Sequence, residues 1–330
     1  MKQFNTLSKI SIVSLLFFAG CKKSDNIPSF TPGLNVYMAG ESNGAAVYWK
    51  NGQQVNLANN GISKSIAVVG QDIYIAGQTA QSIQGKTSLL ATVWKNGIQQ
   101  NLTNSGSATA YGIGITGNDV YAIGSIVDSP GVRAVFWKNG IQVNLAPLSE
   151  GYADAIGFSG TDIYVAGILG NTRDTAVYWK NGIITPYLSI SDDGLHSGMS
   201  FSGADLYSVG KFGGKAIFYK NRQITYLENN YNTYSAATGI TIIGSDVYIS
   251  GLIFDPIGNI NAVYWKNGAL TILEKKYDSA IANGIAVAGN DVYVIGTVHE
   301  NSTYTPVYWK NGVQQQLSPS GSGNAIAVGN

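Results

Sequence analysis

The stretch Ala45–Asn56 reads AAVYWKNGQQVN and contains the phrase that decides the fold, because close copies of it recur along the whole chain. The aromatic residue of this phrase falls at Trp49, Trp94, Trp137, Trp179, Tyr219, Trp265 and Trp309. The steps between these positions are 45, 43, 42, 40, 46 and 44 residues, and the column holds all six tryptophans of the chain. A period of this size indicates a protein built from structural repeats.

A second phrase alternates with the first and completes each repeat. Its copies include GQDIYIAG at Gly70–Gly77 and GNDVYVIG at Gly289–Gly296. The Asn-Gly pair after each YWK-like segment favours a two-residue type I′ hairpin, because both central positions need positive φ. Each repeat therefore predicts four short antiparallel strands, and four strands every 40–46 residues are typical of a β-propeller blade.

The two ends of the chain predict how such a ring would close. Leu34–Gly40 (LNVYMAG) matches the second strand of a repeat, whereas Asn324–Asn330 (NAIAVGN) matches a first strand with nothing after it. Together they complete one blade, which removes exposed strand edges. The sequence thus predicts an all-β, seven-bladed β-propeller over residues 34–330, closed by pairing of the N- and C-terminal strands.

Composition excludes some partners. Charged residues make up 12% of the 330-residue chain and the formal net charge is +1, which argues against a nucleic-acid groove with clustered Lys and Arg. The 41 glycines fit many tight turns between short strands. We expect a monomer that binds no nucleic acid.

The N-terminus, MKQFNTLSKISIVSLLFFAGC, combines two lysines with an apolar run too short to span a bilayer, and it indicates an export signal. Its last residues, FAGC, resemble a bacterial lipobox, which implies a signal peptide over residues 1–20 and lipidation of Cys21, the only cysteine. Residues 21–33 would then be the lipid anchor and tether. The alternative is an ordinary secretory signal with an incidental cysteine. Lys22 in place of Asp suggests an outer-membrane lipoprotein, on either the periplasmic or the cell-surface side.

The alternating phrases resemble the extracellular HAF repeat, whose units pair an aromatic-rich W-x-[ND]-G segment with a downstream Leu. The matching pattern here is YWKNGxxxxL, repeated along nearly the whole mature chain. The GNDVYVIG-like phrase departs from the usual glycine-rich stretch of that family. The resemblance implies an exported repeat protein and brings no catalytic residues.

A candidate ligand site follows from aligning the innermost strands of the repeats on their opening Ile or Met, such as Ile66. The preceding residue is always small, and the one before it varies and is mostly polar. The variable column comprises Lys64, Tyr111, Asp154, Ser197, Thr238, Asn283 and Asn324. These side chains should ring the mouth of the central channel, on the face with long and variable loops, where recognition usually lies. Tyr152 and His196 in adjoining loops complete the predicted ligand-binding set.

Two interpretations of this ring remain open. Tyr with Asn and Asp suits a glycan or peptide, because it combines flat apolar area with hydrogen-bonding groups. The alternative is a set of solvated loop ends around a water-filled channel. The repeated Asp of the GxD turns and the seven motif lysines favour turn and surface roles, since one carboxylate per blade cannot form a metal cage. We therefore expect no metal site and no cofactor.

The sequence favours one of three function classes. An enzyme is disfavoured, because the chain has two histidines, His196 and His299, and the predicted ring offers a single carboxylate, whereas glycoside hydrolysis generally needs two. The favoured interpretation is a non-enzymatic, lipid-anchored binding module for a glycan or protein, acting through the variable-loop face. The alternatives are a structural or envelope-assembly scaffold and, less favoured, a carbohydrate-active enzyme.

Overall fold

The computed structural model describes residues 33–83, 85–128, 131–145, 150–170, 175–186, 195–221, 223–273 and 277–329. The predicted signal peptide, the lipidation site Cys21 and the tether up to residue 32 lie outside the described residues. The described chain is all-β, as the sequence predicts, and consists of 28 strands without a helix.

The strands form sets of four antiparallel neighbours, called units here and numbered along the chain. The innermost strands are β28 (Gly321–Gly329), β4 (Gly61–Val69), β8 (Ser107–Thr116), β12 (Gly151–Ser159), β16 (Leu195–Ser202), β20 (Ser235–Ile243) and β24 (Ser279–Ala288), for units 1 to 7 respectively. The second strands are β1 (Asn35–Ser42), β5 (Asp72–Ile83), β9 (Asp119–Val127), β13 (Asp162–Leu169), β17 (Asp205–Phe212), β21 (Asp246–Phe254) and β25 (Asp291–Glu300).

Two further strands complete each unit toward the outside. The third strands are β2 (Ala45–Lys50), β6 (Lys86–Lys95), β10 (Val132–Lys138), β14 (Thr175–Lys180), β18 (Lys215–Lys220), β22 (Ile260–Lys266) and β26 (Thr303–Lys310). The outermost strands are β3 (Gln53–Ala58), β7 (Ile98–Asn101), β11 (Ile141–Asn144), β15 (Ile183–Pro186), β19 (Gln223–Tyr226), β23 (Ala269–Ile272) and β27 (Val313–Gln316).

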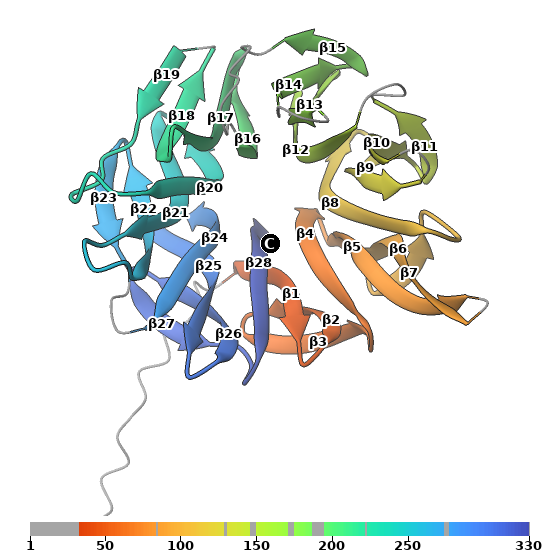
Figure 1. The fold of residues 1–330 in the computed structure, drawn as a ribbon, viewed down its shortest axis with the longest axis horizontal. Coiled ribbons are helices and arrows are strands. Elements are labelled where there is room, and N and C mark those ends of the chain that lie inside the picture. Colours follow the sequence, from red (N-terminus) through yellow and green to blue (C-terminus); the bar gives the residue numbers. More distant parts are fainter. Residues whose placement is uncertain are drawn as a thin grey trace, which may run out of the picture.

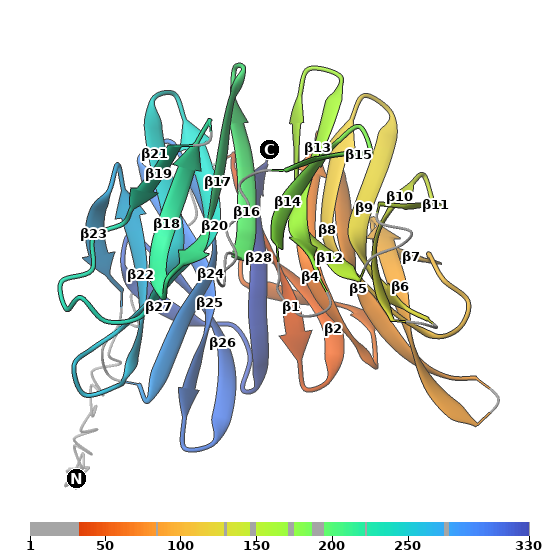
Figure 2. The same cartoon turned by 45° about the horizontal axis from the view of Figure 1, so that its top comes forward.

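The units are arranged around a central axis, with their innermost strands nearest the centre (Figure 1). Each innermost strand contacts the innermost strand of the next unit, and β28 contacts both β24 and β4. A tilted view shows the strands running between the two faces of a disc (Figure 2). The fold is therefore propeller-like, and side chains on the innermost strands can converge on one axis.

Unit 1 is assembled from both ends of the chain. β28 pairs antiparallel with β1, so that Met38 lies opposite Ile326 and Asn35 opposite Gly329. The units are otherwise nearly separate sheets. Single parallel bridges, Leu89 with Ser107 and Ile260 with Ser279, join units 2 and 3 and units 6 and 7 into eight-stranded sheets.

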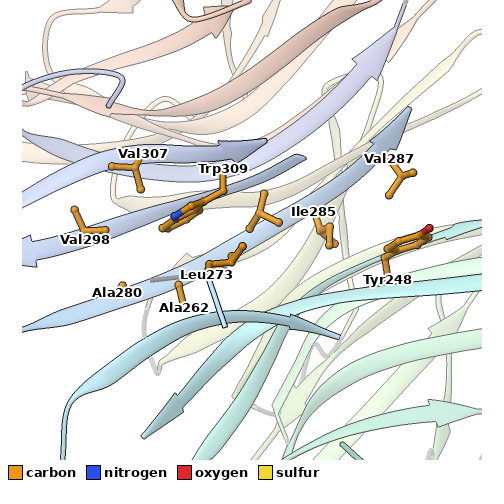
Figure 3. Close-up of a cluster of buried hydrophobic side chains, with 11 residues drawn as sticks. Tyr248, Ala262, Leu273, Ala280, Ile285, Val287, Val298, Val307 and Trp309 are labelled. Carbon is orange, nitrogen blue, oxygen red and sulfur yellow. The ribbon is translucent and has the colours of Figure 1, made fainter. Parts of the chain in front are cut away.

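The aromatic column packs between neighbouring units. All six tryptophans are at most 1% exposed, and Tyr219 takes the same place in unit 5. Trp309 of unit 7 lies in one apolar cluster with Ala262 and Leu273 of unit 6 (Figure 3). Because an indole buries about 200 Å² or more of surface, this column makes a major contribution to holding adjacent units together.

The hairpins between third and outermost strands are the predicted type I′ turns in six units. Asn51 and Gly52 have φ of 52° and 79°, and the five other Asn-Gly pairs repeat these values within a few degrees. Each turn Asn also bonds the GxD turn of its unit. In unit 3, Asn139 Nδ2 donates to Asp119 Oδ1 at 2.8 Å, and its Oδ1 accepts from Val120 N at 2.9 Å. Both kinds of turn therefore lie on the same face, as the repeat predicts.

A motif lysine and a tyrosine complete this arrangement. In unit 2, Lys95 Nζ lies 3.0 Å from Asp72 Oδ2 and 5.1 Å from the ring centroid of Tyr74. The same Asp, Asn, Lys and Tyr combination recurs in units 2 to 7, and unit 1 has Asn35 in place of the Asp. We call each combination a tip cluster. The predicted turn role of the Asp is present, but the lysines are paired within their own units rather than simply solvated.

Within the part of the chain that the structure describes, no helix is long and apolar enough to cross a membrane.

Candidate ligand-binding site

Every innermost strand contains one β-bulge, and the extra residue is the one in the variable column. In β4, Ser63 pairs with Gly77 and Ser65 with Ala76, so Lys64 has no partner across the strand. In β12 the same shift between Ala153 and Ala155 leaves out Asp154. The other extra residues are Tyr111, Ser197, Thr238, Asn283 and Asn324. A bulge redirects a side chain relative to its strand, so seven bulges at one height create a ring.

The seven bulged residues, called the bulge ring, line one central cavity of about 310 Å³. The cavity is completed by the two residues that follow each of them, such as Ser65 and Ile66 in β4. The structure thus brings together all seven residues of the variable column. The bulges lie in the first half of each innermost strand, nearer the end reached from the long fourth-to-first loops.

The start of these strands differs from the sequence-based prediction. We expected the innermost strand of unit 2 to open at Ile66, whereas β4 begins at Gly61. The strand also pairs on the N-terminal side of Lys64, where Gly61, Ile62 and Ser63 lie opposite Thr79, Gln78 and Gly77 of β5. Lys64 and its equivalents therefore lie inside strands, not at loop ends, and a water-filled channel lined by these side chains stays the alternative to a ligand site.

Tyr152 and His196, the two predicted site residues outside the variable column, are placed as follows. Tyr152 lies in β12, is 37% exposed and does not contribute to the lining of the central cavity. It therefore lies outside the cavity lining, although it stands two residues before Asp154 on β12. The backbone of His196 pairs with Gly210 at the start of β16, but its side chain lies outside the described residues.

The small residue after each bulge has a packing cause. A Cβ on Gly198 would lie 3.3 Å from Gly239 Cα, and a Cβ on Gly239 would lie 3.2 Å from Gly284 Cα. Innermost strands of units 5, 6 and 7 therefore approach backbone to backbone at this height. Small residues at this position allow the strands to close around the axis.

Three ring residues bond the neighbouring unit in a repeated way. Thr238 Oγ1 donates to Ala282 O at 2.5 Å, Asn283 Nδ2 to Gly323 O at 2.7 Å, and Asn324 Nδ2 to Ser63 O at 2.8 Å. Each acceptor is the residue just before the next bulge. These side chains therefore connect units 6, 7, 1 and 2, and their main hydrogen-bonding groups are already engaged.

The remaining four ring residues are consecutive around the axis. Lys64, Tyr111, Asp154 and Ser197 make no side-chain hydrogen bond or ion pair with any other side chain or backbone group that the structure describes. We call them the open arc. Ser197 is exposed, and the other three are partly buried in the cavity wall. The two sides of one cavity thus differ: one is satisfied internally, and the other presents unpaired polar groups.

Burial perturbs both ionisable groups of the open arc. It raises the pKa of Asp154 to about 7, with no nearby positive charge to offset the loss of solvation. Burial also lowers the pKa of Lys64, against an opposing attraction from Glu41 on β1. Perturbed groups of opposite sign in a cavity are a recognised mark of a functional site, although buried structural groups show such shifts too.

A second signal was overlooked in the sequence. Gly40–Gly44 (GESNG) matches the G-x-S-x-G pattern of hydrolase nucleophiles, which requires a strand, a sharp turn and a helix. Here Ser42 ends β1, is 3% exposed, and precedes a hairpin in which Asn43 and Gly44 have φ of 51° and 82°. The local structure is thus a β-hairpin, and the match carries no catalytic meaning.

Other candidate features are weaker. A larger groove of about 680 Å³ lies between units 2 and 3 and includes Gln81, Asn104 and Gln142. Its one carboxylate, Asp128, is paired with Arg133. Among the described residues, no three His, Cys, Asp or Glu side chains gather closely enough to hold a metal ion.

Comparisons with known proteins address the fold. No family model matches the chain, so the likeness to HAF repeats and to lipoproteins remains a prediction from the sequence. No curated protein matches it either.

Solved structures are similar at low identity. TolB from Acinetobacter baumannii is 12% identical, with a TM-score of 0.51 over 77% of this chain and 66% of that one. The β-propeller domain of the Trilobed protease from Pyrococcus furiosus is 12% identical, with a TM-score of 0.50 over 87% of this chain and 95% of that domain. Pyrococcus horikoshii acylaminoacyl peptidase is 14% identical, with a TM-score of 0.52 over 87% of this chain.

These likenesses support a propeller-like fold. The chain spans 66% of the TolB chain and 51% of the peptidase, so much of each of those proteins has no counterpart here. At these identities the fold alone is comparable, and the activities of those proteins are not transferred.

Proposed function

We propose that residues 34–330 form a seven-bladed β-propeller that acts as a non-enzymatic binding module and takes its ligand in the central cavity. Seven units of four strands supply the blades, and the pairing of β28 with β1 closes the ring. The observation that carries the binding role is the open arc, where four adjacent ring residues converge on one cavity without internal partners.

The side chains of the open arc have no partner within the part of the chain that the structure describes. The polar groups of the open arc line a cavity without an internal hydrogen-bond partner, so they are available to water or to a ligand that enters it. The satisfied side of the ring shows that this backbone readily allows internal bonds. The open arc departs from that arrangement on a single side, which supports selection for an external partner.

A non-enzymatic role fits the residues that line the cavity. Asp154 is the only carboxylate among them, and neither a histidine nor a cysteine is present in the described lining. Paired carboxylates or a nucleophile with its base would be needed for the common hydrolytic mechanisms. The module would therefore bind a glycan, a protein segment or a small ligand without converting it.

We further propose that the module is attached to the bacterial cell envelope, in the outer membrane, by a lipid on Cys21. The tether would join the propeller at Asn35, whose side chain bonds Asn51 in a tip turn. The tips would then be closer to the membrane, and the variable loops would face away from it. Mass spectrometry of the mature N-terminus tests this: a diacylglyceryl cysteine is expected, and an unmodified or earlier-cleaved N-terminus would contradict it.

The binding role is tested with the full chain purified in detergent. A glycan array, a pull-down and a thermal-shift screen of small polar compounds should reveal a ligand whose binding is lost when Tyr111 and Asp154 are replaced by Ala. Asp162→Asn, which changes an aspartate in the tip of unit 4, serves as the control for general damage. No ligand in any assay, with no cellular effect of the ring variants, would leave the envelope-scaffold role.

A further inference from the structure

The open arc carries two opposite charges in a fixed order. Lys64 of unit 2, Tyr111 of unit 3 and Asp154 of unit 4 follow one another around the cavity. Lys64 and Asp154 are the only ionisable side chains of the bulge ring besides the Tyr111 phenol. They form no ion pair with each other, although both line the same 310 Å³ space. A positive and a negative group therefore face one cavity across a tyrosine.

The size of the cavity limits what can contact both charges. A volume of about 310 Å³ lies at the lower end of small-molecule pockets and can hold a ligand of amino-acid size in contact with the ring. The other polar groups that line the space are the hydroxyls of Ser65 and Ser197 and the engaged side chains of Thr238, Asn283 and Asn324. Among the lining residues that the structure describes, no other side chain is charged.

Resting on the proposed binding role of the central cavity, we propose that its ligand is a small zwitterion of the amino-acid class. The ammonium group of the ligand faces Asp154, its carboxylate faces Lys64, and its chain lies against Tyr111. Each charged hydrogen bond replaces solvation that the ring residue lost on folding.

A ligand with a single charge satisfies only half of the arc. An amine alone leaves Lys64 without a bonded partner, its nearest opposite charge being Glu41 on β1. An anion alone leaves Asp154 unpaired, and burial then favours the neutral acid. A neutral polyol pairs neither charge. The zwitterion gains both contacts at once, so its affinity should exceed that of either half by about tenfold or more.

The pH dependence follows from the same groups. Near neutral pH, where burial places the pKa of Asp154, only part of the protein has the ionised carboxylate that an ammonium requires. Lys64 is the other charged group of the open arc, and burial lowers its pKa. Affinity for the zwitterion should therefore rise as the pH passes through about 7, and it should fall again at higher pH where Lys64 loses its proton.

The test uses calorimetric titration of the full chain at about pH 8. The probes are glycine, β-alanine, γ-aminobutyrate and ε-aminohexanoate, which separate the two charges by increasing distances, with methylamine, acetate and glucose as single-charge and neutral controls. We expect one member of the zwitterion series to bind at least about tenfold more tightly than methylamine or acetate.

Matched variants separate the two contacts. In Asp154→Asn the zwitterion should bind no more tightly than acetate does. In Lys64→Met it should bind no more tightly than methylamine does. Asp162→Asn in the tip of unit 4 and Lys95→Met in the tip of unit 2 should leave both unchanged.

The outcomes distinguish this inference from the binding role on which it rests. Binding of a saccharide or other neutral compound in the cavity, without preference for zwitterions, would overturn the inference and leave the binding role intact. No binding of any probe, together with no ligand from the wider screen, would overturn both. Zwitterion binding that survives Asp154→Asn and Lys64→Met would place the site elsewhere and overturn the inference.

Discussion

The tip clusters and the bulge ring both contain Asp, Lys and Tyr, but these residues are paired at the tips and unpaired in the ring. Asp162 in the tip of unit 4 has a pKa below its usual value because Lys180 and Asn181 bond it, whereas burial raises the pKa of Asp154 in the same unit to about 7. In unit 2, Tyr74 and Asp72 raise the pKa of Lys95, while burial lowers that of Lys64.

The difference separates the repeated features of a unit from its variable features. At the tips, both the backbone geometry and the residues recur, and every group has its partner inside the unit. In the ring, the bulge recurs but the residue changes from unit to unit. A repeated backbone that presents different side chains is a scaffold for a specific surface.

The largest expected effect comes from removing β28. Deleting residues 321–330 takes the innermost strand from unit 1, exposes the edge of β1 and removes Asn324 from the ring. We expect loss of cooperative folding and aggregation, because the loss is comparable with the stability of a typical domain, about 5–15 kcal/mol. Size-exclusion chromatography and a thermal melt check this, with deletion of Asn330 alone as the control. A monomeric truncation with the wild-type melting temperature would refute the role of β28 in closing the ring.

The second prediction concerns Asp154 and pH. Because its pKa is about 7 in the folded protein and about 3.8 when unfolded, the folded state holds more protons between these values, so stability falls as pH rises through this window. Asp154→Asn removes that penalty. The free energy of unfolding of Asp154→Asn should equal that of wild type at about pH 4. At about pH 8 it should exceed the wild-type value by on the order of 2–4 kcal/mol.

Urea denaturation at several pH values measures this difference. Asp162→Asn is the matched control and should show the opposite sign, because the ionised form of Asp162 is stabilised by Lys180. A pH-independent difference between wild type and Asp154→Asn would show that Asp154 is not desolvated in the folded protein.

The third prediction tests the close approach of the innermost strands. In Gly239→Ala the new methyl would lie 2.9 Å from Ser250 Oγ and 3.2 Å from Gly284 Cα. Since one of these neighbours is backbone, we expect a loss of about 1–3 kcal/mol in the free energy of unfolding. Ala155→Gly, in the same column of unit 4, should cost less. Equal or greater stability of Gly239→Ala would mean that the ring can widen.

The smallest effect is expected at a tip. Asn139→Ala puts a residue that tolerates left-handed backbone less well than Asn at φ of 51°, and it removes the bonds to Asp119 and Val120, which should cost about 1 kcal/mol. Asn139→Gly keeps the backbone geometry and should cost less. Both variants should retain wild-type ligand binding, as measured by calorimetry. A weakened affinity in either would mean that tips and ring are coupled.

The repeat in the sequence predicted much of the fold for a physical reason. Trp spacing, Asn-Gly turns and the second phrase of each repeat are local signals, and they indicate the four-stranded units, the type I′ turns and the pairing partners at the two ends. The variable column also identified Lys64, Tyr111 and Asp154 as neighbours around one axis.

The remaining features depend on packing between units, which no local pattern encodes. The bulges were missed because an extra residue in a strand leaves no signal except the interrupted alternation at positions such as Lys64. The division of the ring was missed because bonds such as Asn324 to Ser63 O join residues from opposite ends of the chain. Sequence proximity to Asp154 also groups Tyr152 with the ring, whereas Tyr152 does not line the cavity.

The most direct test of the central claim compares two aspartates of one unit. A ligand found in the screen is titrated calorimetrically into wild type, Asp154→Asn and Asp162→Asn at about pH 8. If the bulge ring is the recognition site, Asp154→Asn loses about tenfold or more in affinity and Asp162→Asn binds as wild type does. Unchanged affinity in Asp154→Asn, or an equal loss in both variants, would contradict the account.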